Sequence, residues 1–338
     1  MRLLELEDPR WFDFVQSRSN ATLFHHPAWA GLLAETYGYR PMVVTIAERG
    51  GTPSAAMQII DVSRPLGGRR WVSLPFTDHC PLLVDGSESE MAAGVAEVAR
   101  TWKLDLLEVR GTLSGHAAVG RDPAFVRHEL AVSPDMETVW GRLFKNHRRN
   151  VRIAERADVR VTLGRAPSDL ETFYRLHLRT RRRLGVPVQP RRFFTLLCER
   201  IIGRDLGFVL TAKSGDTPVA SAVFGSWNRT LIYKYSARDE RFAKLDANYL
   251  LLWTAIRWAC ENGYRALDLG RSNVEQDLLR GFKSGWGARE EPLAYSRIAR
   301  APGRGASPRL ANAMALVIRN STPWVCRALG ELFYKYAT

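Results

Sequence analysis

The residues best suited to chemistry lie in the second half of the sequence. Lys283, one of seven lysines in the chain, falls in the glycine-rich segment 281–287, which we expect to be a loop. A lysine ammonium in such a position can stabilise negative charge that develops on a reacting oxygen. Residues 233–236 and 268–273 each follow or end a predicted strand, where open α/β sheets commonly present ligand contacts. These segments predict one polar site.

A strongly basic block precedes these segments. Residues 142–200 carry 16 basic and 5 acidic side chains, whereas residues 1–141 carry 13 basic and 18 acidic ones. The block therefore supplies most of the formal net charge of +14. The members that we expect to contact an anion are Lys145, Arg148, Arg149, Arg152, Arg179, Arg181 and Arg182. The clustering predicts an anionic partner such as RNA, a nucleotide-linked substrate or a membrane headgroup, with a solvated helical face as the alternative.

Several common catalytic patterns are missing from the sequence. It has no GxGxxG after a strand, no GxxxxGK[ST], no HExxH and no GxSxG, and its seven histidines lack metal-ligand spacing. The four cysteines lie far apart, which disfavours a zinc site or a disulfide framework and suits a reducing cytosol. No apolar run reaches the ~18 residues of a membrane span, and the N-terminus has no signal-peptide core. We expect a cytoplasmic protein without a metal site.

The elements that would position these residues follow one order in both halves: helix, hairpin, strand, helix, strand. In the first half the predicted elements are a helix at 27–37, strands at 41–47, 54–62 and 70–74, a helix at 88–103, and strands at 104–110 and 125–132. In the second half they are one or two helices within 135–157, a strand at 159–163, helices from 168 and at 193–202, strands at 207–213, 219–227 and 230–236, a helix at 247–262, and a strand at 266–269. This repetition predicts an α/β (α+β) fold built by internal duplication.

The predicted domains are 1–132 and 133–300, and residues 301–338 form a linker and a C-terminal helical tail. We expect the tail to cap the second domain, with peripheral contact to a membrane as the alternative.

Short motifs in both halves carry a family resemblance. In the second half they are Phe144-Lys145-Asn146, residues 148–152, the helix from Tyr174 to Arg181, Asn248 with Trp253, Asp268-Leu269-Gly270, Gly281-Phe282-Lys283 and Trp286-Gly287. In the first half they are His26-Pro27 with Trp29, Gly38-Tyr39, and residues 73–76. Together they resemble the Fem-type (FemAB-like) aminoacyltransferases of the GNAT acyltransferase superfamily over roughly residues 20–300. The resemblance implies two tandem GNAT-like domains, here without the coiled-coil arm of some members.

The resemblance also implies a reaction and a set of site residues. Characterised members transfer an amino acid from aminoacyl-tRNA to an amine of a peptidoglycan precursor or a small peptide. The family's Phe-Lys pair falls on Phe282 and Lys283, whose ammonium would stabilise the oxyanion. A substrate-contacting aromatic falls on Tyr233 or Tyr235. The expected substrate-binding set is completed by Asn248, Asp268 and Arg271.

The chemistry needs no bound cofactor, because an aminoacyl-tRNA is an activated ester and amide formation then requires neither ATP nor a protein nucleophile. The acceptor stays open among a peptidoglycan precursor, a small peptide and an exopolysaccharide component.

The segment before the predicted helix at 247–262 bears on the donor. GNAT enzymes that use acyl-CoA cradle its pyrophosphate on backbone N–H groups in a glycine-containing loop, and residues 241–248 contain no glycine. We therefore expect aminoacyl-tRNA as the donor. The alternatives are an acyl-CoA-dependent N-acyltransferase and a non-catalytic protein that binds RNA or an anionic ligand. Charge reversal at Arg181 and Arg182 is expected to weaken tRNA use and to leave the fold intact.

Overall fold

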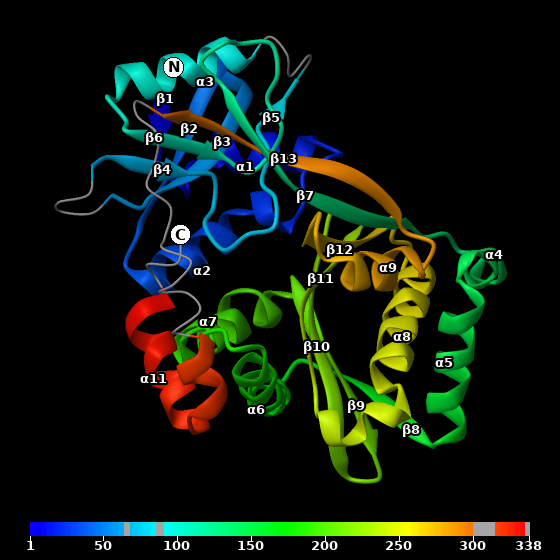
Figure 1. Ribbon diagram of the computed structural model, residues 1–338. Coiled ribbons are helices and arrows are strands. Elements are labelled where there is room, and N and C mark those ends of the chain that lie inside the picture. Colours follow the sequence, from blue (N-terminus) through cyan, green and yellow to red (C-terminus); the bar gives the residue numbers. More distant parts are fainter. Residues whose placement is uncertain (64–67, 86–90, 300–314, 335–338) are drawn as a thin grey trace.

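A single sheet of thirteen strands runs through both halves of the chain (Figure 1). The computed structural model describes residues 1–63, 68–85, 91–299 and 315–334. The order of hydrogen-bonded strands is β1-β2-β3-β4-β6-β13-β7-β12-β11-β10-β9-β8, and β5 pairs with β3 beside this path. Because the sheet is continuous, the domain boundaries 1–132 and 133–300 stay a prediction.

The first half contains the predicted helix, hairpin, strand, helix and strand. Its helices are α1 (Pro9–Ser17), α2 (Pro27–Tyr37) and α3 (Met91–Thr101). Its strands are β1 (Arg2–Leu4), β2 (Arg40–Arg49), β3 (Thr52–Asp61), β4 (Arg70–Val72), β5 (Leu83–Val84), β6 (Leu106–Val109) and β7 (Gly120–Ala131). As predicted, α2 begins at Pro27 and ends at Gly38, whose φ of 71° suits glycine.

The second half repeats this order. Its helices are α4 (Met136–Arg142), α5 (Lys145–Arg156), α6 (Pro167–Leu184), α7 (Arg191–Arg200), α8 (Ala247–Glu261) and α9 (Asp277–Ser284). Its strands are β8 (Val159–Gly164), β9 (Gly207–Ser214), β10 (Thr217–Trp227), β11 (Thr230–Arg238), β12 (Ala266–Asn273) and β13 (Arg289–Ala299). The repetition confirms the predicted α/β (α+β) fold built by internal duplication.

Two elements near the end of this half differ from the sequence prediction. Residues 281–284 belong to α9 rather than to a loop, so Lys283 lies in the last turn of a helix. Strand β13 was not predicted, because its first four residues are charged or proline. It pairs with both β6 and β7, and its pairing with β6 carries the end of the second half back to the first.

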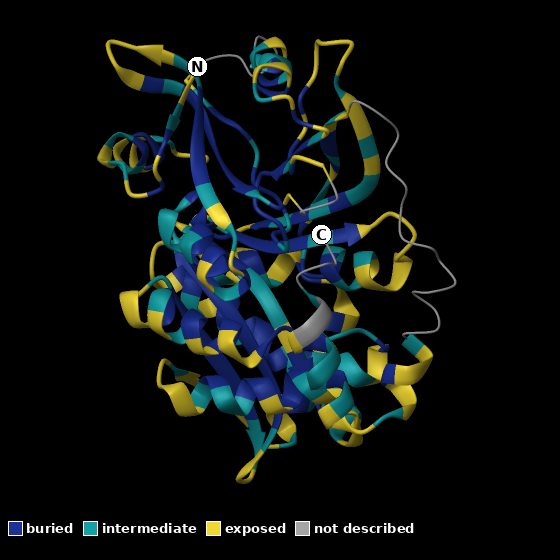
Figure 2. Ribbon diagram, turned by 90° about the vertical axis from the view of Figure 1, so that its left-hand side faces the viewer, coloured by how far each residue is buried: buried dark blue, intermediate teal, exposed yellow. Residues whose placement is uncertain are grey.

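Helices cover both faces of the sheet and enclose three clusters of buried apolar side chains. One cluster joins the halves, because it contains residues of α1 and α2 together with residues of α6 and α7. On the other face, α3 encloses a cluster of the first half, and α4, α5 and α8 enclose one of the second half. Figure 2 shows buried residues running through the region where the halves meet. The two halves therefore share a core.

The C-terminal segment ends in helix α11 (Pro323–Phe333), which packs against α6 (Figure 1). Cys326 is fully buried, and the ring of Tyr334 lies 4.9 Å from that of Phe76 in the first half. The expected linker at 301–309 lies outside the described residues, whereas the helical tail caps the molecule as predicted. Within the ranges given above, no helix combines the length and apolarity needed to cross a membrane.

Gly330 tests the docking of α11. A Cβ atom at this residue would lie 2.0 Å from the carbonyl oxygen of Val188, so Gly330→Ala must push the helix away. We expect a loss of about 1–3 kcal/mol in the free energy of unfolding, measured by urea denaturation. Gly141→Ala is the matched control, because its Cβ would meet nothing within 4 Å in α4. The control should be neutral or stabilising by up to about 1 kcal/mol, and equal stabilities of the two variants would contradict this packing.

Candidate active site

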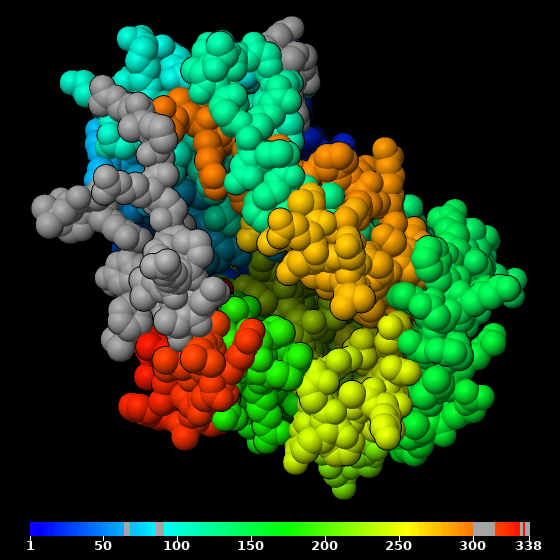
Figure 3. Space-filling view, viewed as in Figure 1, coloured from blue at the N-terminus to red at the C-terminus, as the bar shows by residue number. Residues whose placement is uncertain are grey.

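Strands β11 and β12 separate near the middle of the sheet. They pair in parallel only over Thr230–Ile232 and Ala266–Asp268. Beyond these residues β11 stays hydrogen-bonded to β10, and β12 stays hydrogen-bonded to β7. A bulge in β11 increases the separation, because Val223 and Phe224 pair with Tyr235 and Tyr233 and leave Lys234 between them. Figure 3 shows the surface hollowed between α6, α8 and α9 over these strands.

Lys283 lies beside this opening with its ammonium inside the protein. The side chain is 6% exposed, and Nζ donates hydrogen bonds to the carbonyl oxygens of Gly270 (2.9 Å) and Arg271 (2.8 Å) in β12. Burial lowers the pKa of Lys283 to about 8. An ammonium has three N–H donors, so two hold the residue and one is left for a substrate.

Asp268 positions the carbonyl group that Lys283 contacts. Its side chain is fully buried, and Oδ1 accepts a hydrogen bond of 2.7 Å from the N–H of Gly270. Gly270 has a φ of 70°, a conformation that glycine adopts without strain. Asp268 is therefore a positioning residue within the predicted substrate-binding set.

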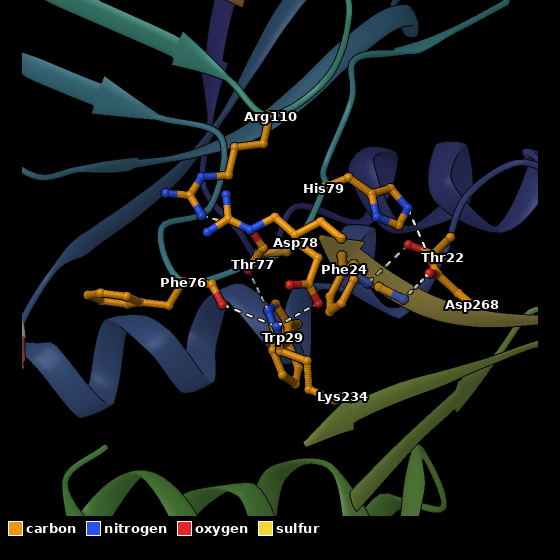
Figure 4. A network of polar contacts seen from close by, with 12 residues as sticks. Thr22, Phe24, Trp29, Phe76, Thr77, Asp78, His79, Arg110, Lys234 and Asp268 are labelled. Atoms are coloured by element: carbon orange, nitrogen blue, oxygen red, sulfur yellow. Dashed lines mark hydrogen bonds and ion pairs between the residues drawn. The ribbon is translucent and has the colours of Figure 1, made fainter. Parts of the chain in front are cut away.

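A buried ion pair that the sequence analysis missed joins the two halves (Figure 4). Nζ of Lys234 lies 3.0 Å from Oδ2 of Asp78 and donates a second bond of 3.2 Å to the carbonyl oxygen of Phe76. Burial lowers the pKa of Lys234, although Asp78 acts against this shift. Burial alone would raise the pKa of Asp78, but the Lys234 ammonium outweighs it and the pKa is lowered. The sequence signal that could have revealed this ion pair is the lysine at position 234 within a largely apolar strand.

Arg271 belongs to the same network. Its guanidinium lies 4.3 Å from the ring centre of Phe125 and donates a hydrogen bond of 2.8 Å to Oη of Tyr295. That hydroxyl donates to the backbone oxygen of Asp78 at 2.6 Å. The structure thus brings together Lys283, Arg271 and Asp268, three of the candidate site residues named from the sequence.

The two predicted tyrosines do not share one environment. Tyr233 packs against Phe224 in the cluster beneath α8, whereas Tyr235 packs against Phe193 and Phe194 of α7. The bulge at Lys234 is the cause, because it breaks the two-residue repeat that would place both tyrosines on one face. Burial raises the pKa of each tyrosine.

Phe282 and Asn248 lie at the edges of the site. The backbone oxygen of Phe282 is 2.9 Å from Nε2 of His147 in α5, and its ring lies 5.4 Å from that of Tyr249. Asn248 is half-buried in the first turn of α8, and its side chain makes no hydrogen bond to any described residue. The backbone of Phe282 thus joins α9 to α5, and a substrate contact by Asn248 stays a prediction.

Helix α5, which carries four of the predicted anion-binding residues, begins beside the end of α9. The N–H of Phe144 donates to the backbone oxygen of Gly285 at 2.9 Å, so the start of α5 is joined to the end of α9. Gly285 has to be glycine, because a Cβ there would lie 2.0 Å from the His147 ring. The predicted anion-binding side chains on this helix are exposed or half-exposed: Lys145, Arg148, Arg149 and Arg152.

The basic residues of α6 form a second, separate group. α6 packs on the opposite face of the sheet from α5, because its buried residues belong to the cluster that joins the halves. Arg179 pairs with Asp239 at 3.0 Å. Arg181 donates to the backbone oxygen of Pro187, and Arg182 donates to that of Ser321. Charge reversal at Arg181 or Arg182 would remove these bonds and should lower the stability of this region; that the fold stays intact is still a prediction.

We looked among the described residues for a thiol nucleophile and for a cluster of metal ligands. Burial raises the pKa of Cys80 to about 12 and also raises that of Cys198, so neither thiol is prepared to act as a nucleophile. Within residues 1–63, 68–85, 91–299 and 315–334, no group of three His, Cys, Asp or Glu side chains could hold a metal ion.

A comparison with protein families finds a match in the second half of the chain. Residues 141–284, from α4 to α9, match the family model of the acetyltransferase (GNAT) domain. No curated protein matches the chain by sequence. The second half is therefore similar to acyltransferase domains of the GNAT type.

Solved structures show the same fold along nearly the whole chain. The crystal structure of FemX has a TM-score of 0.69 at 14% identity and covers 88% of this chain and 97% of its own. The C-terminal domain of a putative lysylphosphatidylglycerol synthetase from Agrobacterium fabrum has a TM-score of 0.57 at 14% identity, covering 92% and 96%. A tandem GNAT protein from the clavulanic acid biosynthesis pathway has a TM-score of 0.51 at 12% identity, covering 90% and 100%. The resemblance to the FemABX-like GNAT fold is confirmed.

The Lys234–Asp78 pair gives a direct test of the junction. Asp78→Asn should cost about 3–5 kcal/mol in the free energy of unfolding, because it leaves the Lys234 ammonium buried without a counter-ion. The double variant Asp78→Asn/Lys234→Met removes that charge and should recover much of the loss. Urea denaturation of both single variants and the double variant measures the coupling, and additive losses would contradict a shared pair.

Proposed function

We propose that this protein is an aminoacyltransferase that moves an amino acid from aminoacyl-tRNA to the amine of a peptide or a cell-wall-precursor-like acceptor. The observation that carries the proposal is the buried ammonium of Lys283, fixed by two carbonyl groups at the opening between β11 and β12. A fixed, partly desolvated cation of this kind is suited to a reaction in which an oxyanion develops. The GNAT acyltransferase fold supports acyl transfer as the reaction class.

The reaction follows from the chemistry of the donor. The acceptor amine attacks the ester carbonyl carbon, a C–N bond forms, and the carbonyl oxygen becomes negatively charged. The remaining N–H of Lys283 donates to that oxygen. The ester C–O bond then breaks, and the proton lost by the amine ends on the hydroxyl group of the tRNA. Holding both substrates in the opening supplies the orientation that the step needs.

The surroundings of Lys283 favour tRNA as the donor. Helix α5 meets α9 at the Phe144–Gly285 hydrogen bond, so its basic residues begin beside the site. Phe144 is 55% exposed next to Lys145 and offers a surface on which a nucleotide base can stack. A basic helix with an exposed aromatic ring at its start suits the backbone and the unpaired end of an RNA.

An acyl-CoA-dependent N-acyltransferase is the second candidate, because the matching family model is that of an acetyltransferase domain. The start of α8 argues against it. Asp246 precedes that helix with a φ of 51° and places a carboxyl group where a pyrophosphate would meet the helix N-terminus. An acidic group there repels phosphate.

Two of the similar proteins support a choice of acceptor. FemX and a putative lysylphosphatidylglycerol synthetase both share this fold. Their likeness supports transfer of an amino acid, and that to FemX supports a peptide or cell-wall-precursor acceptor. We place the reaction in the cytoplasm, where charged tRNA is available.

Substitution of Lys283 tests the role of the ammonium. Lys283→Ala should lower kcat for transfer from charged tRNA by about 10²–10³-fold, because it removes one oxyanion donor. The assay follows a labelled amino acid from total aminoacyl-tRNA onto short peptides and a peptidoglycan-precursor pentapeptide. Lys213→Ala, which removes a half-exposed lysine of β9, is the matched control and should retain activity.

The same assay separates the candidate functions. RNase should abolish transfer, and acetyl-CoA should not replace charged tRNA. Transfer that survives RNase and uses acetyl-CoA would overturn the proposed donor. Full activity of Lys283→Ala would overturn the catalytic assignment.

Charge reversal on α5 tests RNA docking. Lys145→Glu/Arg149→Glu should weaken tRNA binding, and the slope of log affinity against log salt should fall by about 1 for each phosphate that the protein no longer neutralises. Arg156→Glu is the control, because it is an exposed residue at the other end of the same helix. Equal effects of the two changes in a filter-binding salt titration would indicate general charge attraction and contradict a docking surface at the start of α5.

A further inference from the structure

A polar cavity of about 390 Å³ lies on the far side of the strand opening from Lys283. Thr230 and Ala266 line it, and these are the first residues of the parallel strands β11 and β12. The Lys283 site lies beyond the opposite ends of the paired segment. The cavity is therefore separate from the candidate active site, and its volume lies within the range of small-molecule pockets.

The charge of the lining is predominantly positive. Arg127, Arg229 and Arg265 face a single acidic lining residue, Glu129. Arg127 pairs with Glu129 and its Nε also lies 3.3 Å from Oδ2 of Asp268. Arg229 and Arg265 are exposed, and their guanidinium groups pair with none of the described residues. Two cations are thus left free at the entrance.

The turn that carries Arg229 is held in a conformation that disfavours arginine. Asn228 and Arg229 form a two-residue hairpin turn between β10 and β11 with φ values of 49° and 58°. Such turns favour glycine at the second position. The amide of Asn228 fixes the turn against the first half by donating to the backbone oxygens of Arg18 (3.0 Å) and Ala21 (2.7 Å). The turn therefore holds Arg229 at the edge of the cavity, beside the first half.

One further lining residue, His79, is almost fully buried. His79 is 4% exposed, and its Nδ1 has no hydrogen-bond partner among the residues that the structure describes. Burial lowers the pKa of His79, and it lowers that of the neighbouring His25 to about 3, so both imidazoles are neutral near pH 7. Figure 4 shows His79 beside Thr22 and Asp268. Nε2 of His79 lies 3.5 Å from Oδ2 of Asp268, so the ring joins the cavity lining to the residue that holds Gly270.

We propose that this cavity binds a small molecule through an oxyanion, either a phosphate monoester or a carboxylate. Arg229 and Arg265 supply the charged contacts at the entrance, and the neutral ring of His79 lines the interior. The cavity is connected to Lys283 through Asp268. His79 and Arg127 of the lining contact the Asp268 carboxylate. That carboxylate accepts a hydrogen bond from the N–H of Gly270, whose carbonyl oxygen accepts one from Lys283. The inference goes beyond the proposed function and does not depend on it.

Anion binding to the full chain tests the site. Inorganic phosphate and acetate are titrated separately by calorimetry, and the unfolding temperature is recorded with and without each anion. The wild type should bind at least one of the two. Arg229→Gly and Arg265→Ala should each weaken that binding by at least about 10-fold, as expected for loss of a charge-assisted hydrogen bond. Arg257→Ala, which removes an exposed arginine without an ion pair to any described residue on α8, is the matched control and should bind like the wild type.

Arg229→Gly also separates binding from folding. Because glycine suits the turn, this variant should unfold at the same or a higher temperature than the wild type without anion, while its affinity falls. Stronger binding of phosphate than of acetate would assign a phosphate monoester, and the reverse would assign a carboxylate. No binding of either anion by the wild type, or unchanged affinity in both Arg229→Gly and Arg265→Ala, would overturn the proposal.

Discussion

A buried ion pair at the junction of the two halves fixes the geometry on which the site depends. Nζ of Lys234 in β11 lies 3.0 Å from Oδ2 of Asp78 in the first half. The backbone oxygen of Asp78 accepts a hydrogen bond from the hydroxyl of Tyr295, which in turn accepts one from Arg271. A buried charge that loses its partner is costly, so the halves are held in one arrangement around the opening. The shared apolar cluster beneath α2, α6 and α7 acts in the same direction. The site is therefore assembled by contacts between halves.

Within that arrangement, backbone groups of the sheet fix the position of the Lys283 ammonium. Strands β11 and β12 stop pairing after Asp268, which frees the backbone carbonyls of the next residues. Asp268 holds Gly270 in a left-handed conformation, and the Gly270 and Arg271 carbonyls then take two of the three Lys283 donors. A donor fixed in advance needs no reorganisation as charge develops on the substrate, which is the property that makes such groups effective.

The sequence predicted what depends on local signals. Helix α2 carries proline at its start and glycine at its end, and the β2–β3 hairpin has two glycines at its turn, so both were predicted closely. The duplication of the fold followed from the repeated order of predicted helices and strands. Lys283, Arg271 and Asp268 were named as separate candidates, and the contacts that bring them together depend on the bend of β12 at Gly270. Strand β13 was missed because it begins with charged residues and proline, and its strand character depends on pairing with β6 and β7, more than 150 residues away in the first half. The different environments of Tyr233 and Tyr235 were not predicted, because they depend on a bulge in β11. The separation of the basic residues into two groups was not predicted either, because it depends on which face of the sheet α5 and α6 cover.

The central claim is that the buried Lys283 ammonium stabilises the oxyanion, and the pH dependence of single-turnover transfer from charged tRNA tests it most directly. The pKa of Lys283 is lowered to about 8, so the charged form is present below that pH and is lost as the pH rises through it. The wild-type rate should therefore fall above about pH 8, whereas Lys283→Arg, which stays charged, should not show that fall. Wild-type and Lys283→Arg rates that keep rising together above that pH would contradict the account.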